Sequence, residues 1–192
     1  MGKINRDILK DYSKYESLLK ERKHTLVRTI SFCKTKLNRK DILYFESKLN
    51  HTSIDEELKL ILEVKTSNSK DFKFKLRCTA LSQEPFFRFD SYGAAHKNNN
   101  PDIPLHEQIV TTPHFNAFDN KGKAIAYKTS QLKSPTESKA LEDINLCFTH
   151  FCFETNTRYP EDDFTQISLE KEGQLNLVSN SEDILSNINF GV

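Results

Sequence analysis

The chain lacks several features that would assign it to a familiar class. No apolar run approaches the roughly 18–20 residues of a membrane span, and the N-terminal residues lack the apolar region of a secretion signal. The four cysteines form no Cys-x-x-Cys pair, which argues against zinc ribbons and dithiol redox motifs. No internal repeat is visible. We therefore expect a soluble, cytoplasmic protein with reduced cysteines and no membrane contact.

A strong net charge is also absent. The formal net charge of +1 argues against a dedicated nucleic-acid-coating protein. The charge is nevertheless unevenly spread, because residues 1–50 carry 13 Lys and Arg against 6 Asp and Glu, whereas residues 151–192 carry 2 against 8. This polarity fits either a surface that faces a polyanion or mutual packing of the two ends.

The hydrophobic pattern of the 192 residues predicts one α+β domain over residues 1–158. Apolar residues at helical spacing predict an N-terminal helix within 1–22. Alternating segments predict an antiparallel sheet of about six strands over 25–130. Ser134, Pro135 and Glu137 resemble a helix start, so we expect a long C-terminal helix over 135–156 that packs on the sheet. Residues 159–192 are expected to form an acidic C-terminal extension.

Candidate functional residues gather around the irregular segment 91–108. Loops of that length inside a compact domain are often functional. Strand alternation places Arg88 and Asp90 on one face, and His114 and Asn116 on one face of a later strand. If the chain returns to the same part of the sheet, His96 joins this group.

Three interpretations of the histidines His96, His106 and His114 stay open. In the first, two imidazoles act as general base and general acid on an RNA phosphodiester, without a cofactor, because neutral and protonated histidine coexist near neutral pH. Arg88 or Lys97 would stabilise the charge on phosphate, and Asn116 would orient the substrate. In the second, the histidines bind a divalent ion together with Asp90 or Asp119, although their spacing matches no standard metal module. In the third, they are structural and form hydrogen bonds with backbone groups of the loop.

Two stretches carry a family resemblance: FRFDSYGAAHKNNN (87–100) and TTPHFNAFDNKGKAIAY (111–127). Their Arg-x-Asp, Gly-x-x-His-x-Asn, Pro-His and Gly…Ala-Tyr elements resemble a family of uncharacterised prophage and mobile-element proteins. They are more distantly similar to TumE-type toxins of toxin–antitoxin systems. The resemblance covers about 40 residues and points to Arg88, Asp90, His96, Asn98, Pro113 and His114. Asn116 stands where those families tend to place a second histidine.

The resemblance implies a phage or mobile-element protein with toxin-like action on RNA or on translation. In this hypothesis His96, His114, His106 and Arg88 are catalytic, and Lys97, Asn98, Asn116 and Asp90 bind the substrate. The alternative is a non-enzymatic anti-defence inhibitor that binds a host protein, such as a CRISPR or other immunity effector. A cognate antitoxin is a further expected partner.

Overall fold

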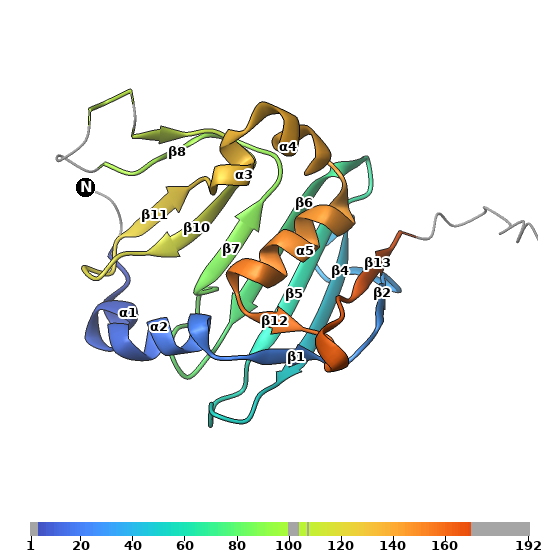
Figure 1. Ribbon diagram of the computed structural model, residues 1–192, viewed down its shortest axis with the longest axis horizontal. Helices are drawn as coiled ribbons and strands as arrows, with labels where there is room; N and C mark the ends of the chain where they lie inside the picture. The colour runs from blue at the N-terminus through green and yellow to red at the C-terminus, as the bar shows by residue number, and fades with distance from the viewer. Residues whose placement is uncertain (1–3, 100–103, 107, 170–192) are drawn as a thin grey trace, which may run out of the picture.

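The computed structural model of the chain describes residues 4–99, 104–106 and 108–169. Within these residues, nine strands form one curled sheet (Figure 1). In spatial order the strands are β11 (Ala124–Tyr127), β10 (His114–Phe118), β7 (Phe87–Asp90), β6 (Asn68–Arg77), β5 (Lys59–Lys65), β4 (Arg39–Asn50), β1 (Lys23–Thr25) and β12 (Thr157–Arg158), with β3 (Lys34–Lys36) also paired to β4. Neighbours in this sheet are antiparallel except β1 and β12.

The core lies between one face of this sheet and the helix α5 (Ile144–Glu154), which crosses it (Figure 1). Alternating side chains of β6, β7 and β10 point toward α5, because successive residues of a strand face opposite sides of the sheet. The ring of Phe74 lies 5.2 Å from that of Phe148 and 5.6 Å from that of Phe151, and Phe89 and Phe115 complete this buried aromatic layer. The opposite face of the same strands carries polar residues.

The expected fold class is wrong in its helices and in its strand count. The described residues contain five short α-helices and no long C-terminal helix. The predicted helix over 135–156 is divided into α4 (Pro135–Ala140) and α5, because the Asp143 side chain accepts bonds from two amides at the start of α5 and begins a new helix there. Similarly, Asp11 separates α1 (Arg6–Lys10) from α2 (Tyr12–Lys20).

The additional strands come from short segments without a strong sequence pattern. Residues 23–36 contain β1, β2 (Thr29–Ser31) and β3 in place of one expected strand. Sheet pairing with distant segments, rather than local alternation, produces such short strands. The molecule is therefore a mixed α/β fold that consists mostly of sheet.

Regular structure also forms in two regions where the sequence predicted none, the extension after residue 158 and the irregular segment 91–108. Residues 159–169, expected in the extension, form the 3-10 helix η1 (Pro160–Asp162) and β13 (Gln166–Ser168), which pairs in parallel with β2. The remainder of the expected extension lies outside the described residues. The segment 91–108 contains β8 (His96–Lys97), which pairs with β9 (Ile109–Val110). The helix α3 (Ser130–Lys133) follows β11. Among the described helices, none has the length and apolar character needed to cross a membrane.

Candidate functional site

The polar face of the sheet carries two rows of side chains that run across the strands. Residues that lie opposite each other in neighbouring strands point to the same side of the sheet. The strand register forms one row across β4, β5, β6, β7 and β10 from Tyr44, Glu63, Lys73, Asp90 and His114. The adjacent row contains Glu46, Ile61, Lys75, Arg88 and Asn116. Residues far apart in the chain thus meet at β6, β7 and β10.

Asp90 is the centre of the first cluster on this face. Asp90 is only 5% exposed. Its Oδ2 accepts hydrogen bonds of 2.8 Å from Arg88 Nε and from Asn116 Nδ2, and its Oδ1 lies 3.3 Å from Lys73 Nζ. A buried carboxylate needs such partners, because burial of an unpaired charge is costly. Asp90 therefore fixes the positions of Arg88 and Asn116.

Glu63 forms a second, similar cluster on β5, two strands away from Asp90. Lys36 Nζ and Lys75 Nζ each lie 2.7 Å from a different oxygen of the Glu63 carboxylate. Burial alone would raise the pKa of Glu63, but the hydrogen bonds from these two lysines hold it below its ordinary value. Burial lowers the pKa of Lys75, and Glu63 opposes that shift. Four cations and two carboxylates leave this part of the face with net positive charge.

The two histidines that flank the irregular segment lie close together. The ring centroids of His96 and His114 are 6.4 Å apart. His114 is buried, and its Nε2 lies 3.8 Å from Asp90 Oδ2, which is too long for a direct hydrogen bond. Burial lowers the pKa of His114, and the Asp90 carboxylate partly opposes this shift. The neutral imidazole is therefore favoured at position 114.

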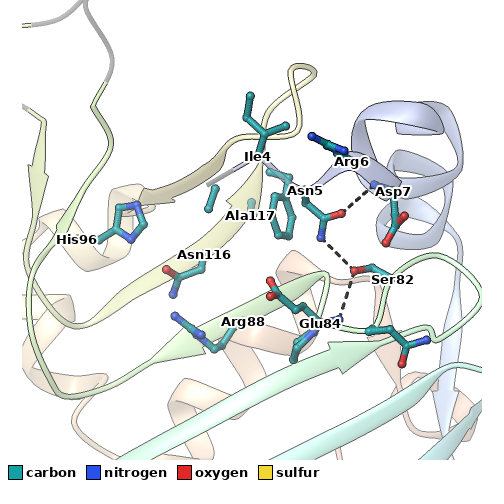
Figure 2. A pocket seen from close by; sticks show the side chains of 14 residues that line it. Ile4, Asn5, Arg6, Asp7, Ser82, Glu84, Arg88, His96, Asn116 and Ala117 are labelled. Carbon is teal, nitrogen blue, oxygen red and sulfur yellow. Dashed lines mark hydrogen bonds between the residues drawn. The ribbon is translucent and has the colours of Figure 1, made fainter. Parts of the chain in front are cut away.

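Two cavities meet at this cluster. The larger has a volume of about 620 Å³ and extends from His96, Asn116 and Arg88 to Asn5 and Glu84, as Figure 2 shows. The smaller, of about 230 Å³, is lined by residues that include Lys73, Asp90, Tyr92 and His114. Arg88, His96 and Asn116 line both. A ligand in either cavity would contact the same three side chains.

Arg88 has the geometry of an anion-binding group. Asp90 holds its Nε, while no described residue bonds to its two terminal nitrogens. The side chain is 41% exposed and lines both cavities. A guanidinium held in this way presents two N–H groups that match two oxygens of a phosphate or carboxylate.

Three candidate residues from the sequence lie apart from this cluster or have other contacts. His106 lies in an exposed turn and lines neither cavity. Lys97 is exposed in β8 and also lines neither. The side-chain amide of Asn98 accepts a bond of 2.7 Å from the Ala126 amide and donates one of 2.9 Å to the Ala126 carbonyl. Asn98 therefore attaches β8 to β11.

Sequence reasoning did not find the N-terminal wall of the larger cavity. Asn5 caps α1 with its side-chain oxygen and donates through Nδ2 to Ser82 Oγ at 3.0 Å, and Figure 2 shows both on the side opposite His96. The helix start at Asn5 is readable from the sequence as an N-cap. Its contact with a residue 77 positions away depends on the tertiary fold.

The described residues contain no group of three or more His, Cys, Asp or Glu side chains arranged to hold a metal ion. Comparisons of the chain with protein-family models, with curated proteins and with solved structures found no significant match. The resemblance to prophage proteins and TumE-type toxins therefore stays a prediction, and the site must be interpreted from its own geometry.

Proposed function

We propose that the protein is a toxin-like ribonuclease that cleaves a phosphodiester with His96, His114 and Arg88. The observation that carries this proposal is the placement of two imidazoles, whose ring centroids are 6.4 Å apart, beside an arginine that lines two cavities. Both histidines line the smaller cavity, so a phosphate bound there would lie beside both rings. The predicted resemblance to TumE-type toxins is consistent with this chemistry.

The reaction needs one histidine as the base and the other as the acid. Neutral His114 accepts the proton of the ribose 2′-hydroxyl, and the 2′-oxygen forms a bond to phosphorus. The bond from phosphorus to the 5′-oxygen breaks, and protonated His96 donates its proton to that oxygen. The products are a 2′,3′-cyclic phosphate and a free 5′-hydroxyl. Burial assigns the base to position 114, because it lowers the pKa of that histidine.

Arg88 and its partners supply the remaining parts of this mechanism. The Arg88 guanidinium donates to the non-bridging oxygens, where negative charge increases in the transition state. Asp90 and Asn116 are positioning residues, because Asp90 holds both Arg88 Nε and the Asn116 amide. Asn116 replaces the second histidine of the resembling families, and His96 takes the second imidazole role.

The test is cleavage of a short single-stranded RNA by the purified protein, with the product ends identified. We expect cyclic phosphate ends, and a rate reduced at least about 100-fold in His96→Ala and in His114→Gln. His51→Gln, which changes a half-buried histidine in the connection between β4 and β5, is the control and should cleave as the wild type does. Because His114 is buried, melting temperatures establish that its variant is folded.

Two results would overturn the proposal. One is a wild-type protein that leaves RNA intact, and the other is a pair of histidine variants that cleave as fast as the wild type. Expression in a bacterial host gives a second readout: wild type should arrest growth and degrade RNA, whereas His96→Ala should not. Equal, harmless growth of both would favour a non-enzymatic inhibitor of a host protein.

A further inference from the structure

We infer that the polar face of the sheet binds a single strand of RNA, with one base stacked on Tyr92 and the backbone following the cations of β6 and β7. This inference rests on the proposed function, because it names the form of RNA that the site accepts. It adds a residue and a surface that the cleavage chemistry itself does not require.

Tyr92 has the exposure and the position of a stacking platform. It lies just after the end of β7 and is 60% exposed, whereas Phe87 and Phe89 of that strand are buried. It lines the smaller cavity together with Arg88, His96 and His114. A base stacked on this ring would therefore belong to a nucleotide next to the reacting phosphate. Stacking on an aromatic ring is tolerant of sequence, since every base has a π-face.

Small residues leave space beside the ring. Gly93, Ala94 and Ala95 follow Tyr92 and line the same cavity. A Cβ added at Gly93 would meet no atom within 4 Å. The cavity of about 230 Å³ is therefore bordered next to Tyr92 by residues with little or no side chain.

The cations beside this cavity form a continuous path across the strands. Lys75 lies opposite Arg88 in the register of β6 and β7, and Lys73 lies opposite Asp90. Lys36 and Lys75 share Glu63, while Lys73 and Arg88 share Asp90. Because each carboxylate is shared by two cations, neither cluster is neutral. The side chains of Lys73 and Arg88 are 39% and 41% exposed and can reach a backbone phosphate.

The exposed Tyr92 ring, the cavity beside it and the neighbouring cations together favour a single strand over a duplex. In a duplex each base is covered by its neighbours, so a protein ring can stack only on a base that has left the helix. The candidate base site is a concave pocket, whereas duplex RNA is recognised through contacts across its minor groove. An unpaired strand can place a base in the cavity while its phosphates remain beside Lys73 and Arg88.

The experiment measures binding separately from cleavage. A fluorescent ten-nucleotide RNA with 2′-O-methyl groups cannot undergo transesterification, and its anisotropy reports the Kd with wild-type protein. We expect Tyr92→Leu to weaken binding about tenfold and Tyr92→Phe to preserve it. Phe153→Leu is the matched control, because Phe153 is 59% exposed on α5, which lies on the other face. Lys73→Gln should reduce the dependence of log Kd on log salt by about one.

The inference is wrong if the duplex form of the same RNA binds as tightly as the single strand, if Tyr92→Leu binds like the wild type, or if the wild type does not bind. The outcomes separate the two proposals. Cleavage that depends on His96, together with unchanged binding in Tyr92→Leu, would retain the ribonuclease and reject the stacking site. Tyr92-dependent binding without cleavage of ordinary RNA would retain the surface and reject the ribonuclease.

Discussion

Glu63 and Asp90 show how single buried carboxylates organise a cationic face. Lysines and an arginine placed side by side on one sheet face would repel each other, and like charges opposite each other destabilise a sheet. Each of these two carboxylates lies between two cations and offsets that repulsion. The pairs also fix the side chains in position. The positive charges of the flexible lysine side chains are thereby held at defined positions.

Glu63→Gln tests this contribution to stability. At pH 7 we expect the unfolding free energy to fall by about 2 kcal/mol, since the substitution leaves Lys75, whose side chain is only 14% exposed, without its carboxylate partner. The pKa of Glu63 in the folded protein lies below its ordinary value of 4.5. Its contribution is therefore complete above pH 4.5 and is lost as the pH falls through the folded pKa.

The measurement is urea unfolding of wild type and Glu63→Gln across this pH range. The difference between them should decrease in acid. Glu16→Gln is the control, because Glu16 forms an exposed pair with Lys20 and should change stability by less than about 0.5 kcal/mol. A Glu63→Gln protein as stable as the wild type at pH 7 would contradict this account.

Part of the candidate site could be predicted from residue spacing alone. Alternation placed Arg88 with Asp90 and His114 with Asn116, and the register of β7 and β10 pairs these residues directly. Their contacts with Lys73 and Tyr92 depend on which strand lies beside β7 and on the path of the segment after Asp90. Alternation within one strand determines neither the neighbouring strand nor the path of the segment after Asp90.

At the scale of elements, the strands were more predictable than the helices. The hairpin of β5 and β6 follows the alternation of its apolar residues. The long helix prediction was wrong because apolar spacing continues across Leu141 and Ile144, whereas Asp143 begins a new helix between them. The same aspartate can be an ordinary helix residue or an N-cap, and tertiary packing of α5 decides between these roles.

The contacts of Asn98 predict that this residue protects the edge strand β11. Its amide bonds to the Ala126 backbone on β11, the last strand of the described sheet, and thereby covers part of an edge. We expect Asn98→Ala to increase the hydrogen-exchange rate of the Ala126 amide about tenfold or more, because two hydrogen bonds are lost. Asn98→Asp retains the acceptor and should give a smaller increase.

Lys97→Ala is the matched control for this measurement. Lys97 is the last residue of β8, directly before Asn98, and it is exposed, so its removal should leave exchange at Ala126 unchanged. Unchanged exchange in Asn98→Ala would mean that β8 does not protect the edge. Because His96 lies in the same short strand, a loosened β8 should also reduce cleavage by the proposed ribonuclease.

At the scale of the whole molecule, the last described strands pair with the strands that follow the two N-terminal helices. β12 pairs with β1, and β13 pairs with β2 (Figure 1). Asn145 on α5 bonds to both the amide and the carbonyl of Ile167 in β13. Mutual packing of the basic N-terminal and acidic C-terminal parts was one explanation of the uneven charge along the sequence. Backbone pairing places the later segment against β1 and β2, and Arg28 and Asp163 form an ion pair between the same two parts of the chain.

A pair of truncations tests whether residues 159–169 belong to the folded unit. A chain that ends at Arg158 loses buried Ile167, the pairing of β13 with β2, and the hydrogen bond between Thr165 and Thr25. Burial of one isoleucine and a few hydrogen bonds contribute about 3 kcal/mol. For a chain of this size, we expect a melting temperature lower by about 6–12 °C than that of a chain ending at Leu169.

The chain ending at Leu169 is the matched reference, because both variants lack residues 170–192 and differ only in the segment under test. Differential scanning calorimetry measures both melting temperatures. Equal values would place the boundary of the folded unit at residue 158, with β13 as an accessory strand. A lower value for the shorter chain would extend that unit to Leu169, since β13 contacts both β2 and α5, and loss of β13 would expose the end of the core.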